Sequence, residues 1–90
     1  MPESIKVLLV DDESAITDSL APFLTNAGFD VRVAGDGVAA LAAAASWRPA
    51  IIVCDVLMPR LDGRGVVREL RQQGDWTPLI LLTKVDATPE

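Results

Sequence analysis

The chain has 90 residues, half of them apolar, and a formal net charge of -5 at neutral pH. This length allows a single small domain with a modest hydrophobic core. The acidic balance predicts no direct binding of nucleic acid by this domain, because such binding requires a basic face. Since the chain contains no histidine, Ser-His-Asp and Cys-His catalysis and a phosphohistidine intermediate on this chain are excluded.

The sequence carries no sign of a membrane segment or an export signal. The N-terminus lacks a basic region followed by a long apolar stretch, so it does not resemble a signal peptide. No apolar run approaches the roughly 20 residues that a membrane helix needs. The single cysteine, Cys54, cannot form an internal disulfide and is predicted to be a small buried hydrophobe. We therefore expect a soluble cytoplasmic protein.

The first predicted element is a short buried strand over residues 5–10, which ends at Asp11 and Asp12. A helix follows, with Ser14 as its expected N-cap and Gly28 at its end. Pro22 should bend this helix near Asp18, since proline removes a backbone hydrogen bond. The apolar positions of the helix fall on one face and are Ile16, Leu20, Phe23 and Leu24.

A second strand is predicted over residues 29–34, followed by a turn at residues 35–37 and an alanine-rich helix over residues 38–46. Residues 50–54 form a third apolar strand that leads into Asp55.

Residues 58–63 have the composition of a loop, and a third helix is predicted over residues 65–73. A fourth apolar strand over residues 79–82 leads into Thr83. The alternation of strands and helices predicts an α/β fold with a parallel sheet, right-handed crossovers and helices on both faces.

The polar residues that follow the strands are Asp11, Asp12, Asp55 and Thr83. In a parallel sheet the carboxyl ends of the strands share one edge, where ligands bind, so we expect these side chains to lie together. Strand-end aspartates often only cap helices or stay solvated, and a single one would be interpreted in that way. Three carboxylates at one edge repel one another without a cation, and Mg²⁺ prefers hard oxygen ligands. The pattern therefore favours a magnesium site at which one carboxylate accepts a phosphoryl group, with Thr83 as a hydrogen-bond donor to it.

Three segments, LLVDDES, CDVLMPRLDG and PLILLT, occur in the order and at the spacing of a response regulator receiver domain. The chain resembles this family from Val7 to Thr83, and the most specific part is D-x-x-M-P-x-x-D-G at residues 55–63. The resemblance implies a flavodoxin-like, doubly wound sheet with strand order 2-1-3-4-5.

The resemblance also implies the roles of individual residues. Asp55 would take a phosphoryl group from the phosphohistidine of a sensor histidine kinase or a phosphotransfer protein, in a self-catalysed transfer followed by autodephosphorylation. Asp12, Asp55 and the backbone carbonyl of Leu57 would bind Mg²⁺ directly, and Asp11 would reach it through water. Thr83 would follow the phosphoryl group on activation. The turn residues Met58, Pro59, Asp62 and Gly63 are expected to shape the loop.

The chain departs from the family pattern after the fourth strand. The family has a phosphate-contacting lysine at the end of a fifth strand and an aromatic residue on that strand, and neither is present. Lys84 directly follows Thr83, so its backbone N–H rather than its ammonium group would face the phosphate. Residues 88–90 have the composition of a helix start.

We therefore expect residues 1–90 to be a single receiver domain that is incomplete at its C-terminus. The expected strand order is 2-1-3-4, without the fifth strand and last helices, and an output domain would follow Glu90. The uncovered fourth strand would favour self-association, because unpaired apolar edges recruit other chains.

Two other functions remain open from the sequence. Residues 35–40 match the dinucleotide-binding pattern G-x-G-x-x-A between a strand and a helix, with Asp55 at about the expected distance. This short pattern is weak by itself, and an acidic pair on the neighbouring strand would repel a pyrophosphate. The second alternative is a non-catalytic, receiver-like interaction module that is not phosphorylated.

Overall fold

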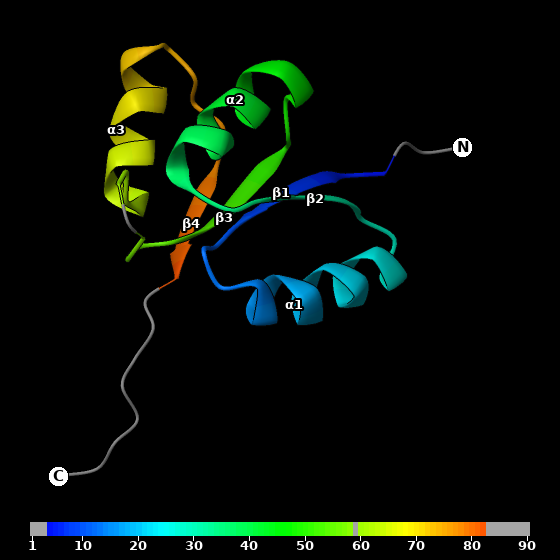
Figure 1. Ribbon diagram of the computed structural model, residues 1–90. Helices are drawn as coiled ribbons and strands as arrows, with labels where there is room; N and C mark the ends of the chain where they lie inside the picture. Colours follow the sequence, from blue (N-terminus) through cyan, green and yellow to red (C-terminus); the bar gives the residue numbers. More distant parts are fainter. Residues whose placement is uncertain (1–3, 59, 83–90) are drawn as a thin grey trace, which may run out of the picture.

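The computed structural model describes residues 4–58 and 60–82, which form a parallel sheet with helices on both faces (Figure 1). The strands are β1 (Lys6–Val10), β2 (Asp30–Ala34), β3 (Ile51–Asp55) and β4 (Leu79–Leu82). The helices are α1 (Ser14–Asn26), α2 (Gly37–Trp47) and α3 (Gly63–Gln72). The strand order β2-β1-β3-β4 confirms the predicted flavodoxin-like arrangement.

The register of the sheet brings the carboxyl ends of the strands to one edge. Val10 of β1 lies opposite Ala34 of β2 on one side and Cys54 of β3 on the other. Asp55 at the end of β3 lies opposite Leu82 at the end of β4. The segments that follow β1 and β3 therefore start side by side.

The main hydrophobic core lies between the sheet and the helices α2 and α3, which cover the same face (Figure 1). Strand residues at alternate positions point into it, as expected for a pleated strand. Its fully buried side chains include Leu8, Ile52, Val66 and Leu70, each at most 1% exposed. Short alanine side chains on α2 allow this helix to pack closely on the sheet.

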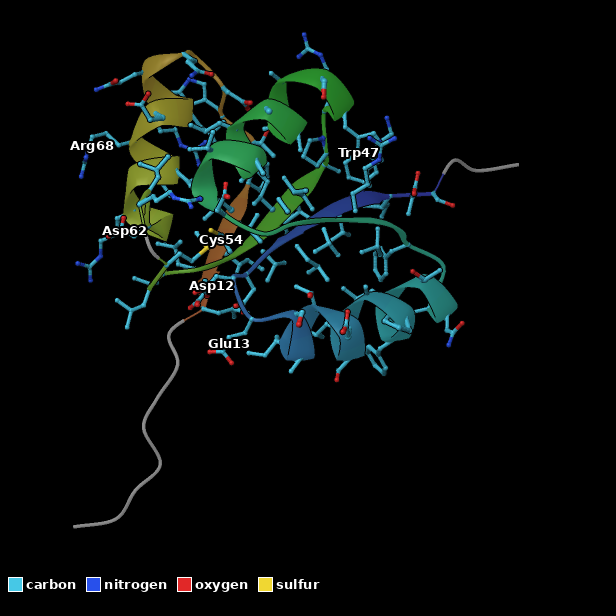
Figure 2. All side chains as sticks on the ribbon, in the orientation of Figure 1. Asp12, Glu13, Trp47, Cys54, Asp62 and Arg68 are labelled. Atoms are coloured by element: carbon cyan, nitrogen blue, oxygen red, sulfur yellow. The ribbon has the colours of Figure 1, made fainter. Side chains whose placement is uncertain are left out.

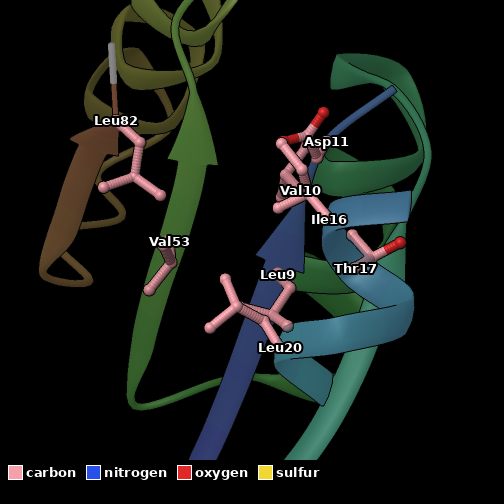
Figure 3. A pocket seen from close by; sticks show the side chains of 8 residues that line it. All are labelled: Leu9, Val10, Asp11, Ile16, Thr17, Leu20, Val53 and Leu82. Carbon is pink, nitrogen blue, oxygen red and sulfur yellow. The ribbon is translucent and has the colours of Figure 1, made fainter. Parts of the chain in front are cut away.

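The opposite face of the sheet is covered by α1, which contacts β1 and β2. Figure 3 shows Val53 of β3 and Leu82 of β4 pointing to this side, where they line a small hollow beside Leu20 of α1. Ile80 and Leu82 remain 48% and 41% exposed. In the part of the chain that the structure describes, no second helix packs beside α1 on this face (Figure 1).

Two details of α1 differ from the prediction. Ser14 is the first helical residue rather than the cap, and the N-cap position belongs to Glu13, whose side chain makes no capping hydrogen bond. Phe23 is 68% exposed, although it was expected on the buried face. Thr17 is buried instead, and its hydroxyl donates to the carbonyl of Ser14 at 3.1 Å. The helix runs without a break through Pro22, and the predicted bend stays a prediction.

The described helices are all too short or too polar to cross a membrane. Thr83, Lys84 and the helix start predicted at residues 88–90 lie outside the described residues.

Candidate functional site

Three carboxylates meet at the edge of the sheet where β1 and β3 end. Asp11 and Asp12 directly follow β1, and Asp55 is the last residue of β3. Each side chain has a carboxylate oxygen within 4.8 Å of an oxygen of the other two. In Figure 2, Asp12 and Glu13 lie just beyond β1, at the end of the sheet away from Trp47. The structure thus brings together the three aspartates that the sequence predicted.

The three carboxylates differ strongly in exposure. Asp55 is 1% exposed and Asp11 is 7% exposed, whereas Asp12 is open to solvent. The backbone N–H of Glu13 donates to Asp11 Oδ1 at 2.8 Å, which fixes the Asp11 carboxylate beside the start of α1. The site therefore has two buried carboxylates, and the exposed carboxylate of Asp12 leaves it open to solvent on one side.

The donor set fits a hard divalent cation. Carboxylate oxygens are the ligands that Mg²⁺ prefers, and the ion commonly keeps several waters in addition to one or two carboxylates. Three carboxylates so close together also need positive charge between them, since like charges at this distance repel. The site is therefore chemically suited to Mg²⁺, and soft or histidine-preferring metals are disfavoured by its all-oxygen ligands.

Backbone hydrogen bonds fix both ends of the loop that follows Asp55. The N–H of Val56 donates to the carbonyl of Leu82 at 3.0 Å, and the N–H of Gly63 donates to the carbonyl of Val56 at 2.9 Å. Between these bonds, the side chain of Leu57 is 68% exposed. Leu57 lies two residues past Asp55, as its implied role as a carbonyl ligand requires, and that role remains a prediction.

Two other aspartates near the site cap helices. Asp62 accepts a hydrogen bond from the N–H of Gly65 at 2.8 Å, so α3 begins at Gly63 rather than at Gly65 as predicted. Asp36 accepts a hydrogen bond from the N–H of Ala39 at 2.8 Å and caps α2. Sequence reasoning expected Asp62 to be structural but did not assign either cap. The preference of aspartate for the position before a helix was the available signal.

Cys54 lies directly before Asp55 and is fully buried. Burial, followed by the negative charges of Asp55, Asp11 and Asp62, raises the pKa of its thiol to about 11. Its Sγ donates to the carbonyl of Asp55 at 3.3 Å. The thiol is therefore neutral near pH 7 and packs as a small hydrophobe, as the sequence predicted.

The family model for the response regulator receiver domain matches residues 7–90 of this chain. The chain belongs to this family. Response regulator MprA of Mycobacterium bovis (strain BCG / Pasteur 1173P2) is 47% identical over 87 residues, which cover 97% of this receiver chain. The same-named protein of Mycobacterium avium (strain 104) is 46% identical over 86 residues. The receiver chain spans 38% of the length of these relatives.

Solved receiver structures share the fold. The receiver domain of the Francisella response regulator 1452 superposes with a TM-score of 0.87 and 36% identity, covering 94% of this chain and 70% of that chain. The chemotaxis response regulator CheY4 of Vibrio cholerae superposes with a TM-score of 0.86 and 37% identity, covering 97% and 73%. These matches agree with the flavodoxin-like fold of the described residues.

Membership of the receiver family argues against the dinucleotide-binding alternative, and the packing agrees. Gly37, the second glycine of the G-x-G-x-x-A match, lies directly against the backbone of Leu61. In a dinucleotide-binding fold this glycine leaves room for the pyrophosphate. Here the loop after β3 fills that room.

Proposed function

We propose that this receiver domain is the phosphoacceptor of a two-component system and that Asp55 receives the phosphoryl group. The observation that carries this proposal is the buried position of Asp55 at the end of β3, with the carboxylates of Asp11 and Asp12 within 4.8 Å. A carboxylate nucleophile beside further oxygen ligands is the arrangement that phosphoryl transfer requires.

In the proposed transfer, a carboxylate oxygen of Asp55 attacks the phosphorus atom of a phosphohistidine on a kinase or phosphotransfer protein. A new O–P bond forms, the N–P bond breaks, and the imidazole nitrogen of the donor leaves with the bonding electrons. Bound Mg²⁺ would neutralise charge on the phosphoryl oxygens. Asp12, Asp55 and the Leu57 carbonyl would hold that ion directly, and Asp11 would hold it through water.

The residues after β4 complete the proposed site. Thr83 would donate its hydroxyl to a phosphoryl oxygen, and the backbone N–H of Lys84 would donate to another. The N–H of Val56 donates to the carbonyl of Leu82, so the chain enters this segment from a strand end that is tied to the phosphoacceptor loop. Hydrolysis by the domain itself would then return Asp55 to its unmodified state.

Acetyl phosphate with Mg²⁺ tests the assignment of Asp55. The protein should gain an acid-labile, hydroxylamine-sensitive phosphate, and Asp55→Asn should abolish it. Asp18→Asn is a matched control, because Asp18 is exposed on α1 and the change removes the same charge. Undiminished labelling of the Asp55→Asn protein would show that Asp55 is not the phosphorylated residue. An unlabelled wild-type protein would favour a non-catalytic interaction module.

Magnesium binding is tested separately, by titration followed through backbone amide NMR shifts. Asp12→Ala should weaken binding by about tenfold or more, a typical cost of disturbing a metal site. Asp18→Ala should leave the affinity unchanged, although both variants lose one exposed carboxylate. Equal affinities for Mg²⁺ in the two variants would refute the metal assignment.

The proposed partners follow from the chemistry of the site and from the length of the relatives. A sensor histidine kinase or a phosphotransfer protein would supply the phosphoryl group in the cytoplasm. An output domain beyond Glu90 would receive the signal, since the relatives named MprA are longer than this chain. We also propose that the 90-residue chain by itself associates through the exposed side of β4.

A further inference from the structure

The turn before α2 packs directly against the loop that follows the phosphoacceptor strand. A Cβ atom on Gly37 would overlap the carbonyl oxygen of Leu61 and would lie 2.8 Å from the Leu61 Cβ. In protein structures, a Cβ atom essentially never lies within 3.0 Å of a heavy atom to which it is not connected through neighbouring bonds. Any side chain at Gly37 would therefore displace the backbone of Leu61 or the start of α2.

Leu61 is held from a second side by α3. A Cβ atom on Gly65 would overlap the Leu61 Cδ1 atom, at the flexible end of the side chain. Leu61 thus lies between the first residue of α2 and the third residue of α3, and at both positions the neighbour is a glycine. The two contacts differ in kind, because Gly37 faces the backbone of residue 61 and Gly65 faces only its side chain.

A polar contact joins the same two segments. Arg60 Nη1 donates to Asp36 Oδ2 at 3.4 Å, and Asp36 caps α2 through its other oxygen. This ion pair is largely exposed on the arginine side, so its own contribution to stability is small. The ion pair is formed by the residues next to Leu61 and Gly37 in the chain. It therefore holds the loop after β3 against the start of α2, as the Leu61 contact does.

The part of the loop that carries the Leu57 carbonyl is packed on both sides, because Val56 and Met58 are 6% and 8% exposed and Met58 belongs to the hydrophobic core. The Leu57 side chain itself is 68% exposed, so the carbonyl that the proposed metal site uses is held through these neighbours and not through its own side chain. The loop is closed by the Gly63 to Val56 hydrogen bond at its base. Its position relative to Asp55 is therefore set by that bond, by the burial of Met58 in the core and by the place of Leu61 between α2 and α3.

We propose that Gly37 is a positioning residue for the divalent-cation site. Its missing side chain lets the backbone of Leu61 lie against α2, and this contact, together with the buried Met58, holds the loop in the position from which the Leu57 carbonyl reaches a cation bound at Asp55. The inference rests on the proposed function, because it takes Leu57 as a ligand. It assigns a role in cation binding to a glycine at the start of α2 that contributes no ligand atom.

The test compares Gly37→Ala with Gly35→Ala in the whole protein. Gly35 lies in the same turn, its backbone conformation suits any residue, and a Cβ there would have no atom within 4 Å. Mg²⁺ affinity is measured by NMR titration, and stability by thermal unfolding without metal. Gly37→Ala should weaken Mg²⁺ binding by about tenfold, whereas Gly35→Ala should bind like the wild type.

The outcomes separate this inference from the proposed function. A wild-type protein that binds no Mg²⁺ would overturn both. A wild-type protein that binds Mg²⁺ and a Gly37→Ala variant of lower melting temperature but equal affinity would overturn the positioning role alone. That second result would mean that the contact only stabilises the fold.

Leu61→Ala covers the case in which Gly37→Ala does not fold. It removes the side chain that lies against Gly65 and should also weaken Mg²⁺ binding. Leu41→Ala is its control, since Leu41 is a partly buried leucine of α2 that packs against the core. Equal Mg²⁺ affinity for the Leu61→Ala and Leu41→Ala proteins would contradict the proposal, whatever the effect of each on stability.

Discussion

The N–H of Gly63 donates a hydrogen bond of 2.9 Å to the carbonyl of Val56, which closes the loop that follows Asp55. The same glycine lies tightly against the strand end. A Cβ atom at this position would be 2.5 Å from the carbonyl oxygen of Asp55 and 2.8 Å from Leu81 Cδ2. The start of α3 is therefore in direct contact with the backbone of Asp55, the proposed phosphoacceptor.

Gly63→Ala should destabilise the protein by about 1–3 kcal/mol, the usual cost of forcing an extra carbon into a packed site. The Asp55 backbone cannot move away easily, because β3 is paired with strands on both sides. Urea unfolding measures the loss, with Gly35→Ala as the control. A Gly63→Ala protein with wild-type stability would show that the contact relaxes without cost.

The buried thiol of Cys54 should make the free energy of unfolding depend on pH in the alkaline range. Its pKa in the folded protein is raised to about 11, from an ordinary value of 9.0, because burial and nearby carboxylates disfavour the thiolate. Unfolding releases the proton more readily, so the folded state should lose stability as the pH rises from about 9 toward 11.

Cys54→Ala provides the comparison for this pH dependence. The free energy of unfolding of the wild type should fall more steeply above pH 9 than that of the variant, although the variant starts lower because it loses buried volume. Urea titrations at several pH values measure both slopes. Parallel curves across this range would contradict the raised pKa.

The turn before β4 should make the free energy of unfolding depend on pH in the acid range. Asp75 Oδ1 accepts hydrogen bonds from the hydroxyl and the N–H of Thr77, at 2.6 and 3.0 Å, and these bonds lower the pKa of the Asp75 carboxyl. A lowered pKa means that the stabilisation is present above the ordinary value of 3.8 and is lost as the pH falls below it.

Asp75→Ala should therefore lower the free energy of unfolding near pH 7 by about 1 kcal/mol, a typical net value for such hydrogen bonds. The difference from the wild type should narrow below pH 3.8. Unfolding followed by circular dichroism at neutral and acid pH measures it. A difference that stays constant down to pH 2 would argue against the carboxylate as its source.

The position of the carboxylates could be predicted from the sequence because it depends on few assumptions. Apolar strands that alternate with helices form parallel sheets, and parallel strands end at one edge. The aspartates at the ends of β1 and β3 were therefore expected at the same edge, and because β1 and β3 are neighbours in the sheet their oxygens lie within 4.8 Å. Only the order of the strands needed the family resemblance.

The face of α1 and the contacts of Gly37 could not be predicted. Helical periodicity placed Phe23 on the buried face, but α1 covers mainly β1 and β2 and leaves that side chain exposed. Thr17 can be buried without loss of hydrogen bonding, because its hydroxyl donates to a carbonyl within the helix. The contact between Gly37 and Leu61 joins the start of α2 to the loop after β3, and a local sequence pattern does not show which distant segments touch.

The side of β4 that faces away from the core exposes apolar side chains to solvent. Ile80 and Leu82 are 48% and 41% exposed there, and the hollow beside Val53 continues this surface toward α1 (Figure 3). Burial of one such side chain contributes about 1.5–3 kcal/mol. In the described residues, β4 is also paired with β3 alone, so one edge of the strand is available for another chain.

The 90-residue chain should therefore sediment as a dimer or larger species at micromolar concentration. Ile80→Lys together with Leu82→Lys should shift it to a monomer, because two charges would lie in the contact and desolvating them is costly. Val33→Lys is the control, since Val33 is 50% exposed on the opposite edge strand β2. A wild-type monomer would contradict the association, and a dimer disrupted equally by Val33→Lys would place the contact elsewhere.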